Sequence, residues 1–263
     1  MADPNLLELI VRESGAGPED VVLEIGGGAG ALTERLADVA SHLHVVEVDE
    51  RLRPGLEAIA AERPNVSLVW GDALRVDLRS LRPPPSKLVS NLPYSIATPL
   101  LLRTIEELPD LGSWTVLVQR EIADRIRAAP GSRLYGAPSV LVQLACDVEL
   151  LRTVNRAVFV PRPRVDSALL RLGRRAPAPS EDVRRLVHAA FAHRRKALAG
   201  SLELTSASTG VGPSRERARA ALRDAGLPED ARAEALAPRD FVELAGRLAT
   251  AAGSSASEEG GAP

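Results

Sequence analysis

The stretch Val21-Val22-Leu23-Glu24-Ile25-Gly26-Gly27-Gly28-Ala29-Gly30 decides the fold of this 263-residue chain. It joins a short apolar run to a glycine-rich turn, and residues 31–40 then have the apolar spacing of a helix. A strand, a tight turn and a helix in this order are typical of the first unit of an open α/β sheet. A plain turn needs one glycine rather than four. The glycines, Gly26 and Gly28 among them, therefore predict close approach of a ligand to the backbone, beside the free N–H groups of a helix N-terminus.

The same alternation of apolar runs and helical spacing continues to about residue 119. Strands are predicted at residues 43–48, 66–70, a fourth ending at 91, and 115–119, with helices at 4–14, 50–62 and 96–108. Alternation of this kind predicts parallel strands with crossover helices. Two further β-rich stretches, 147–154 and 167–172, predict an antiparallel edge on that sheet.

From residue 180 onward the pattern is helical, and proline and alanine interrupt it first at residues 176–179. Helices are predicted at residues 183–198, 214–225 and 238–248, with a loop at 205–213. The sequence therefore predicts an α/β, Rossmann-like domain at residues 1–177 and a small all-helical domain at 178–250. Residues 251–263 are small, polar and acidic, and predict a disordered tail.

Composition restricts the classes of protein to consider. The chain is 45% hydrophobic but only 3% aromatic, so leucine, isoleucine and valine must build its core. No apolar run reaches the ~18 residues that a membrane span needs. No secretory signal is visible at the start, and the single Cys146 excludes an internal disulfide and a cysteine-rich metal site. We expect a cytoplasmic protein that is not bound to a membrane and holds no metal.

Two acidic residues follow the glycine turn at the ends of the next two strands. Glu47 comes 21 positions after Gly26, where a carboxylate can accept hydrogen bonds from ribose hydroxyls. Asp72 ends the third strand, where it can accept from an adenine amino group. The spacing G-x-G-x-G lacks the last glycine of dinucleotide binders, because Ala31 holds that position. It favours S-adenosylmethionine, which has no pyrophosphate, over NAD.

The fourth strand ends in Asn91-Leu92-Pro93-Tyr94. The Asn91 amide oxygen and the Leu92 carbonyl can accept both N–H groups of an exocyclic amine, and the Tyr94 ring can stack on a base. Alone, such a string is more often a strand-end turn. Together with the glycine turn, Glu47 and Asp72, it predicts a methyl-transfer site for an aromatic amine, in which Asn91 and Leu92 stabilise the developing positive charge.

Charge is distributed unevenly along the chain. The net charge is −2, yet residues 162–196 hold ten Arg or Lys and three Asp or Glu, a local excess of +7. This basic block, which includes Arg162 and Arg164, is consistent either with a surface that binds RNA phosphates or with a solvated, arginine-rich helix face.

By its motifs the chain resembles the small-subunit ribosomal RNA adenine dimethyltransferases over residues 3–248. The motifs are EIGGGAGALT at 24–33, VVEVDERL at 45–52, GDAL at 71–74, NLPY at 91–94, QREIADRI at 119–126, GSRLYG at 131–136, FVPRPRVDSALLRL at 159–172 and AFAHRRKALAGSL at 190–202. The resemblance implies that S-adenosylmethionine contacts Gly26, Glu47, Asp72 and Asn91.

The resemblance also assigns the substrate side of the site. Asn91 and Tyr94 would hold the target base and Phe159 would stack on its other face, while Arg194, Arg195 and Lys196 would meet RNA phosphates. The substrate would be two adjacent adenines in the hairpin loop near the 3′ end of 16S rRNA, within the 30S subunit or its precursor. Each adenine would receive two methyl groups, and a monomer is expected.

Two features depart from this family. Its members carry a Q-N/H-F-L segment before the first helix, and this chain begins at Met1-Ala2-Asp3-Pro4, about where that segment should finish. A late start, a truncation and an incomplete site are the alternatives, and we expect the methionine end of the cofactor to be uncovered. In addition, Gly27 stands where the family commonly has proline, which we expect to weaken cofactor binding without abolishing it.

Two other functions fit the same motifs. One is a 23S rRNA adenine methyltransferase that confers macrolide resistance, a group that tends to have Phe at the position of Tyr94. The other is an RNA-binding assembly factor with weak catalysis, which the short N-terminus suggests. Tyr94 and the RRKALAGSL stretch at residues 194–202 favour the small-subunit enzyme.

Overall fold

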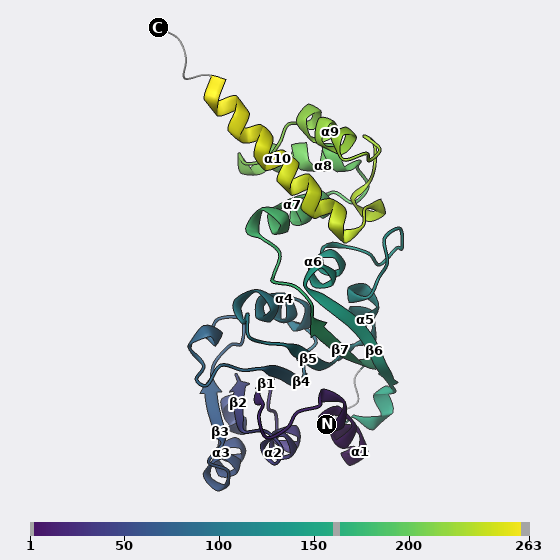
Figure 1. Cartoon of the computed structure of the whole chain (residues 1–263). Helices are drawn as coiled ribbons and strands as arrows, with labels where there is room; N and C mark the ends of the chain where they lie inside the picture. The colour runs from purple at the N-terminus through teal and green to yellow at the C-terminus, as the bar shows by residue number, and fades with distance from the viewer. Residues whose placement is uncertain (1–2, 160–163, 259–263) are drawn as a thin grey trace. The chain divides into compact units, whose positions relative to one another are not determined.

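The computed structural model describes residues 3–159 and 164–258, with side chains described as far as residue 250. The chain forms two compact units (Figure 1). The described parts of Met1–Arg127 and Ala145–Ala178 make the first, and those of Ala128–Leu144 and Pro179–Pro263 make the second.

The first unit is built on one seven-stranded sheet with the strand order β3-β2-β1-β4-β5-β7-β6. The strands are β1 (Val21–Ile25), β2 (His42–Glu47), β3 (Val66–Trp70), β4 (Lys87–Asn91), β5 (Ser113–Gln119), β6 (Cys146–Val154) and β7 (Ser167–Arg174). The first five are parallel, while β7 is antiparallel to both β5 and β6. This confirms the predicted parallel sheet with an antiparallel edge and gives a Rossmann-like topology.

Helices cover both faces of this sheet. α1 (Pro4–Ser14), α2 (Ala31–Ala37) and α3 (Arg53–Glu62) lie on one face, and α4 (Ala97–Glu107) and α5 (Arg120–Ile126) lie on the other (Figure 1). α1 begins where Asp3 accepts a hydrogen bond from Asn5 N and ends at Gly15, whose φ is +57°. Its apolar stripe, Leu6, Leu7 and Ile10, is buried against the sheet in the core.

The second unit is helical. It contains most of α6 (Ala137–Ala145), then α7 (Glu181–Ala192), α8 (Leu198–Thr209), α9 (Arg215–Asp224) and α10 (Pro238–Glu258). The prediction of one helix at 183–198 followed by a loop at 205–213 is wrong. The backbone turns between α7 and α8, where the Ser201 hydroxyl accepts from His193 N at 3.3 Å and donates to Ala189 O at 2.7 Å.

The units differ from the predicted domain ranges in one segment. The sequence pattern places residues 128–144 in the first domain, whereas the structure groups them with the C-terminal helices. Gly131 N donates to Glu234 O at 2.7 Å, and the buried Tyr135 hydroxyl donates to Leu236 O at 2.9 Å. α10 extends to Glu258, past the predicted end at Leu248, so its last residues overlap the predicted tail 251–263, of which 259–263 lie outside the described residues.

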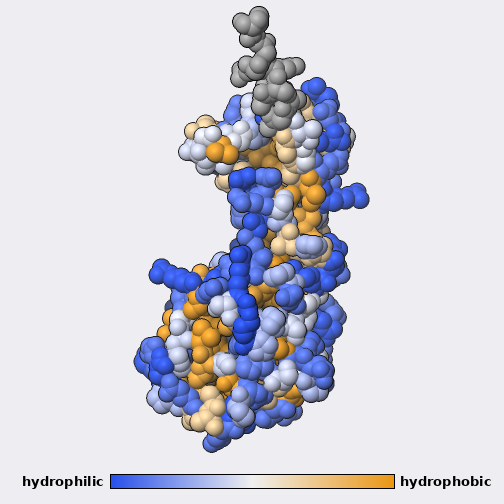
Figure 2. Space-filling model, turned by 60° about the vertical axis from the view of Figure 1, so that its left-hand side comes forward, coloured by the Kyte–Doolittle hydropathy of each residue, from blue (hydrophilic) through white to orange (hydrophobic). Residues whose placement is uncertain are grey.

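The surface of both units is mixed in polarity, with hydrophobic residues interrupting a mostly hydrophilic exterior (Figure 2). The described large hydrophobic side chains that are exposed include Val48 in the first unit and Val211 in the second. Among the described helices, none is both long enough and apolar enough to cross a membrane.

Candidate active site

The glycine turn and the Asn91–Tyr94 turn meet at the carboxyl ends of β1 and β4. Gly26 has a φ of +85°, and its N–H donates to Val46 O at 2.8 Å. A Cβ added at Gly26 would lie 3.4 Å from Pro93 Cγ, so glycine allows the two turns to come into contact. The buried Ser90 hydroxyl donates to Ile25 O at 2.5 Å and joins the two strands just before these turns.

Glu47 is held by backbone donors at the end of β2. The residue is buried, and its Oε2 accepts from Gly28 N at 3.0 Å while its Oε1 accepts from Val48 N at 2.7 Å and Asp49 N at 2.9 Å. The predicted ribose-binding carboxylate is therefore fixed in place by the glycine turn that precedes it. Val48, which the sequence analysis does not single out, is 66% exposed beside it, and only the structure shows this exposure.

A second acid lies beneath the glycine turn and was not predicted as a site residue. Glu24, in β1, is buried, and the Thr33 hydroxyl donates to its Oε2 at 2.6 Å. Burial, and to a smaller extent the negative charge of Glu47, raise the pKa of Glu24 to about 8, against the opposing effect of the Thr33 hydrogen bond. Glu24 is therefore mostly protonated at neutral pH.

Asp72 lies in the turn after β3. Its Oδ1 accepts from Leu74 N at 2.9 Å, its Oδ2 lies 3.6 Å from Arg75 Nε, and its side chain is 43% exposed. The loop is anchored to α4 by Arg103, which donates to Ala73 O at 2.6 Å and Val76 O at 2.7 Å. Arg103 lies 30 positions from Ala73, so only the fold shows that it positions the predicted adenine-binding loop.

The Asn91–Tyr94 turn is fixed at three points. Asn91 is paired with Leu117 in the β4–β5 ladder, and Leu92 N donates to Leu117 O at 3.1 Å. The Tyr94 hydroxyl lies 2.8 Å from the Ser167 hydroxyl oxygen. Among the described residues nothing hydrogen-bonds to the Asn91 Oδ1 atom, although that atom is buried. A buried acceptor without a donor costs about 1–3 kcal/mol, which an N–H group placed there would recover.

Phe159 is packed in the hydrophobic core. It follows the short helix η3 (Arg156–Val158), is 7% exposed, and belongs to the hydrophobic core that includes Val154 and Leu169. The segment before it is held by Asp166, whose Oδ1 accepts from Arg156 N at 3.0 Å. In this position the ring is a core side chain.

The predicted RNA-binding cations fall into different environments. Arg194, in the turn between α7 and α8, donates to Arg133 O and Tyr135 O, both at 3.0 Å, and lies 3.7 Å from Glu234 Oε2. Its neighbours Arg195 and Lys196 are exposed, and within the described part of the chain their side chains have no ion-pair partner. Arg164 is also exposed, and Arg162 lies outside the described residues.

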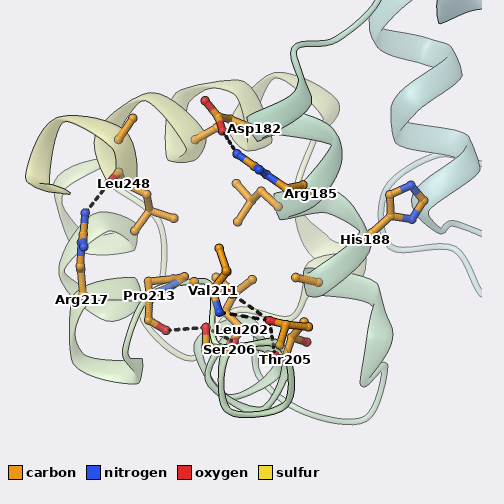
Figure 3. Close-up of a pocket in the computed structure, with 16 residues that line it drawn as sticks. Asp182, Arg185, His188, Leu202, Thr205, Ser206, Val211, Pro213, Arg217 and Leu248 are labelled. Carbon is orange, nitrogen blue, oxygen red and sulfur yellow. Dashed lines mark hydrogen bonds and ion pairs between the residues drawn. The ribbon is translucent and has the colours of Figure 1, made fainter. Parts of the chain in front are cut away.

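A cavity lined by none of these residues lies in the second unit (Figure 3). It has a volume of about 760 Å³ and is lined by α7, α8, α9, α10 and the loop before α9, including Leu202, Val211 and Leu248. The Arg217 guanidinium donates to Leu248 O, while its buried Nε has no partner among the described residues. The cavity contains none of the predicted site residues. The described residues also hold no group of three or more His, Cys, Asp or Glu that could bind a metal ion.

The strand order, the glycine turn and the acidic strand ends define a Rossmann-like methyltransferase. Residues 1–249 match the family described as ribosomal RNA adenine dimethylase. The chain is 45% identical over 250 residues, 94% of its own length and 92% of the other's, to the ribosomal RNA small subunit methyltransferase A of Rubrobacter xylanophilus. The chain therefore belongs to the ribosomal RNA adenine dimethylase family and is a methyltransferase.

Two solved structures share this fold. A dimethyladenosine transferase from Plasmodium falciparum aligns with a TM-score of 0.75 and 24% identity, over 93% of this chain and 95% of that one. The 23S rRNA methyltransferase ErmE aligns with a TM-score of 0.66 and 29% identity, over 95% of this chain and 99% of that one. Both alignments cover the helical second unit as well as the sheet.

Proposed function

We propose that this protein transfers methyl groups from S-adenosylmethionine to N6 of two adjacent adenines in the hairpin loop near the 3′ end of 16S rRNA. It would act as a monomer in the cytoplasm, on the small ribosomal subunit or its precursor. The observation that carries the proposal is the buried, unpartnered Asn91 Oδ1 at the end of β4, beside the glycine turn.

The residues around the glycine turn fit a sulfonium nucleoside. Glu47 supplies carboxylate oxygens for the ribose hydroxyls, and the exposed Val48 offers an apolar surface for the adenine ring. No atom lies within 4 Å of a Cβ added at Gly28, which leaves the backbone there open to a ligand. Asp72 would accept from the adenine amino group once its side chain turns from Arg75. When bound, S-adenosylmethionine supplies an electrophilic methyl group.

The turn after β4 orients the amine that attacks. Asn91 Oδ1 accepts one N–H of the target adenine, and the Leu92 carbonyl accepts the other. Both hydrogen bonds strengthen as N6 becomes positive, so they stabilise the transition state more than the bound substrate. The lone pair of N6 is left facing the cofactor side of the site. No general base is needed before the new bond forms.

Aromatic side chains hold the ring of the base. Tyr94 stacks on one face, with its hydroxyl fixed by Ser167. For Phe159 to cover the other face, its ring must leave the core. Exposing a buried phenylalanine side chain to water costs about 1.5–3 kcal/mol of free energy. Stacking on one base is worth about 1–3 kcal/mol. These magnitudes are comparable, so we propose that base binding itself draws Phe159 from the core.

Small-subunit RNA is favoured over 23S RNA by similarity. Identity to the small-subunit relative is 45%, compared with 29% to the 23S rRNA methyltransferase ErmE. Tyr94 stands where the 23S group tends to have Phe, and the structure gives its hydroxyl a partner in Ser167.

The turn between α7 and α8 is proposed as a contact to RNA phosphates. Arg195 and Lys196 are its exposed cations, whereas Arg194 holds the 131–135 loop through two carbonyl oxygens. Replacing Arg195 and Lys196 together by Ala should weaken binding to 30S particles and reduce the slope of log K against log salt by about 2. Arg194→Ala should mainly lower thermal stability. A salt slope that changes only in Arg194→Ala would contradict this assignment.

One assay tests the proposed function. The protein is incubated with labelled S-adenosylmethionine and, separately, with undermethylated 30S particles and with 50S particles. Label recovered from 30S as dimethyladenosine supports the proposal, and label on 50S supports the resistance enzyme. Binding to 30S without label would support the assembly factor and refute both enzyme functions.

A further inference from the structure

Ser167 is a polar residue in an unusual place. It is the first residue of β7, fully buried at 0% exposure, and it is paired with Gln119 of β5 on one side and Val154 of β6 on the other. Its hydroxyl oxygen lies 2.8 Å from the Tyr94 hydroxyl, 73 positions away in the sequence. Because β7 is antiparallel to β5, its first residue lies at the carboxyl end of β5, next to the Asn91–Tyr94 turn.

The bond to Ser167 fixes the far end of the Tyr94 ring. The start of the turn is already held by the β4–β5 ladder and by Leu92 N, which donates to Leu117 O. The end of the turn is closed by Ile96 N, which donates to Pro93 O at 3.1 Å. These bonds fix the backbone and leave the side chain of Tyr94 free to rotate. The hydroxyl–hydroxyl contact restricts rotation about the Cα–Cβ bond of Tyr94 and so fixes where the ring lies against a base.

We infer that Ser167 is a positioning residue, acting through Tyr94, on which the second methyl transfer to each adenine depends more than the first. The inference rests on the proposed function. In each transfer N6 forms a bond to the methyl carbon with its lone pair while the carbon–sulfur bond of the donor breaks. Sulfur keeps the electrons of that bond, and N6 then releases one proton to water.

The two transfers differ in how firmly the amine is held. Unmodified adenine offers two N–H groups, one to Asn91 Oδ1 and one to the Leu92 carbonyl. Monomethyladenine offers only one, so its orientation relies more on the ring that stacks against it. A Tyr94 ring that can swing away from its place therefore allows the monomethylated base to turn away from the line of attack, while the doubly held adenine is less affected.

The test is the Ser167→Ala variant, assayed on undermethylated 30S particles with the monomethyl and dimethyl products separated after digestion. The ratio of the second rate constant to the first should fall roughly three- to tenfold relative to wild type, since a neutral hydrogen bond contributes about 0.5–1.5 kcal/mol. Monomethyladenosine should accumulate. An unchanged ratio in a folded Ser167→Ala protein would overturn the inference.

Tyr94→Phe provides a second variant that keeps the ring and removes the same bond. It should lower the ratio as Ser167→Ala does, and the double variant should fall no further than either one. Their thermal unfolding should show the same coupling, which is independent of activity. Additive effects in either measurement would contradict the inference. If Ser167→Ala does not fold, Tyr94→Phe alone decides: an unchanged ratio overturns the inference and a lowered ratio supports it.

Thr104→Val is a matched control for general loosening of the first unit. It removes another buried side-chain hydrogen bond, in which Trp114 Nε1 donates to Thr104 Oγ1 at 2.9 Å, near the C-terminal end of α4 and the start of β5. It should lower stability and leave the ratio unchanged. An equal fall of the ratio in Thr104→Val would overturn the inference. A wild-type protein that makes no dimethyladenosine would instead refute the proposed function, which separates the two failures.

Discussion

The candidate site has a cofactor half, formed by the glycine turn, Glu47 and Asp72, and a base half, formed by the Asn91–Tyr94 turn. The two halves differ in whether their buried acceptors already have hydrogen-bond donors. In the cofactor half, the Glu47 carboxylate accepts three backbone N–H groups, from Gly28, Val48 and Asp49. In the base half, around the Asn91–Tyr94 turn, the Asn91 Oδ1 atom is also buried but accepts from nothing among the described residues. The two atoms lie at the ends of strands that both flank β1.

This difference indicates that the cofactor half is preformed, whereas the base half is completed by its ligand. A carboxylate that is already satisfied keeps its position without ligand, so the cofactor half is a preformed surface. A buried acceptor that lacks a donor is less stable until an N–H arrives, so the base half gains more from binding its partner. The same logic places catalysis in the base half, because the partner's N–H groups become better donors as the amine becomes positive.

Removing the unpartnered acceptor should have the largest effect. Asn91→Ala is expected to lower the rate of methyl transfer about 10²- to 10³-fold, comparable to the loss of one donor from an oxyanion hole. Binding to 30S particles should be largely retained, because phosphate contacts elsewhere supply most of it. Single-turnover transfer and particle binding measured on the same preparation check this. A near-normal rate would show that Asn91 does not hold the amine.

The cofactor half should respond in a different measurement. Glu47→Gln removes the negative charge and places an NH2 group near backbone donors, so affinity for S-adenosylhomocysteine should fall about 10- to 100-fold, as expected for hydrogen bonds to a charged group. The rate at saturating cofactor should change much less. Calorimetric titration and initial rates provide the two numbers. If Glu47→Gln lowers only the rate at saturating cofactor and leaves the affinity unchanged, Glu47 does not serve cofactor binding, and the proposed difference between the two halves is wrong.

The sequence predicted the positions that parallel topology brings together. Glu47, Asp72 and Asn91 each follow an apolar run, and the carboxyl ends of parallel strands meet at one edge of the sheet, so their neighbourhood follows from the pattern alone. The antiparallel edge also followed from its two β-rich stretches.

Contacts that depend on register or on side-chain packing could not be predicted. Ser167 meets Tyr94 only because β7 pairs with β5 in one particular register. The sequence does not predict the break between α7 and α8, because helical spacing continues through it. In the structure the Ser201 hydroxyl holds this turn by hydrogen bonds to the backbone of α7 and of the residue after it. In the sequence Arg194 belongs to one basic run with its two neighbours, yet its guanidinium donates hydrogen bonds to backbone carbonyls.

Glu24, beneath the glycine turn, should make the free energy of unfolding depend on pH. Its pKa is raised by burial to about 8 in the folded chain, from 4.5 for an unperturbed group, so between these values the folded state binds more protons than the unfolded state. The free energy of unfolding should therefore fall as pH rises from about 4.5 to about 8, by at most about 1.4 kcal/mol per pH unit from this group. In Glu24→Gln, which keeps an acceptor for Thr33, this slope should be absent. Urea unfolding of both proteins at pH 5, 6.5 and 8 measures it, and equal slopes would exclude Glu24 as the source.

Gly27 tests whether packing, in addition to hydrogen bonds, preforms the cofactor half. A Cβ added there would lie 2.6 Å from Val45 Cγ1 and 3.3 Å from Leu56 Cδ2, so Gly27→Ala must displace a buried valine. Such overpacking typically costs about 1–3 kcal/mol, which thermal or urea unfolding will detect. The control is Gly55→Ala in α3, where no atom lies within 4 Å of an added Cβ and alanine should stabilise the helix by up to ~1 kcal/mol. If Gly27→Ala is as stable as wild type, the turn can shift to accept the added Cβ, and packing does not preform this half. The flexibility of Gly27, which we expect to weaken cofactor binding, would then describe this position better.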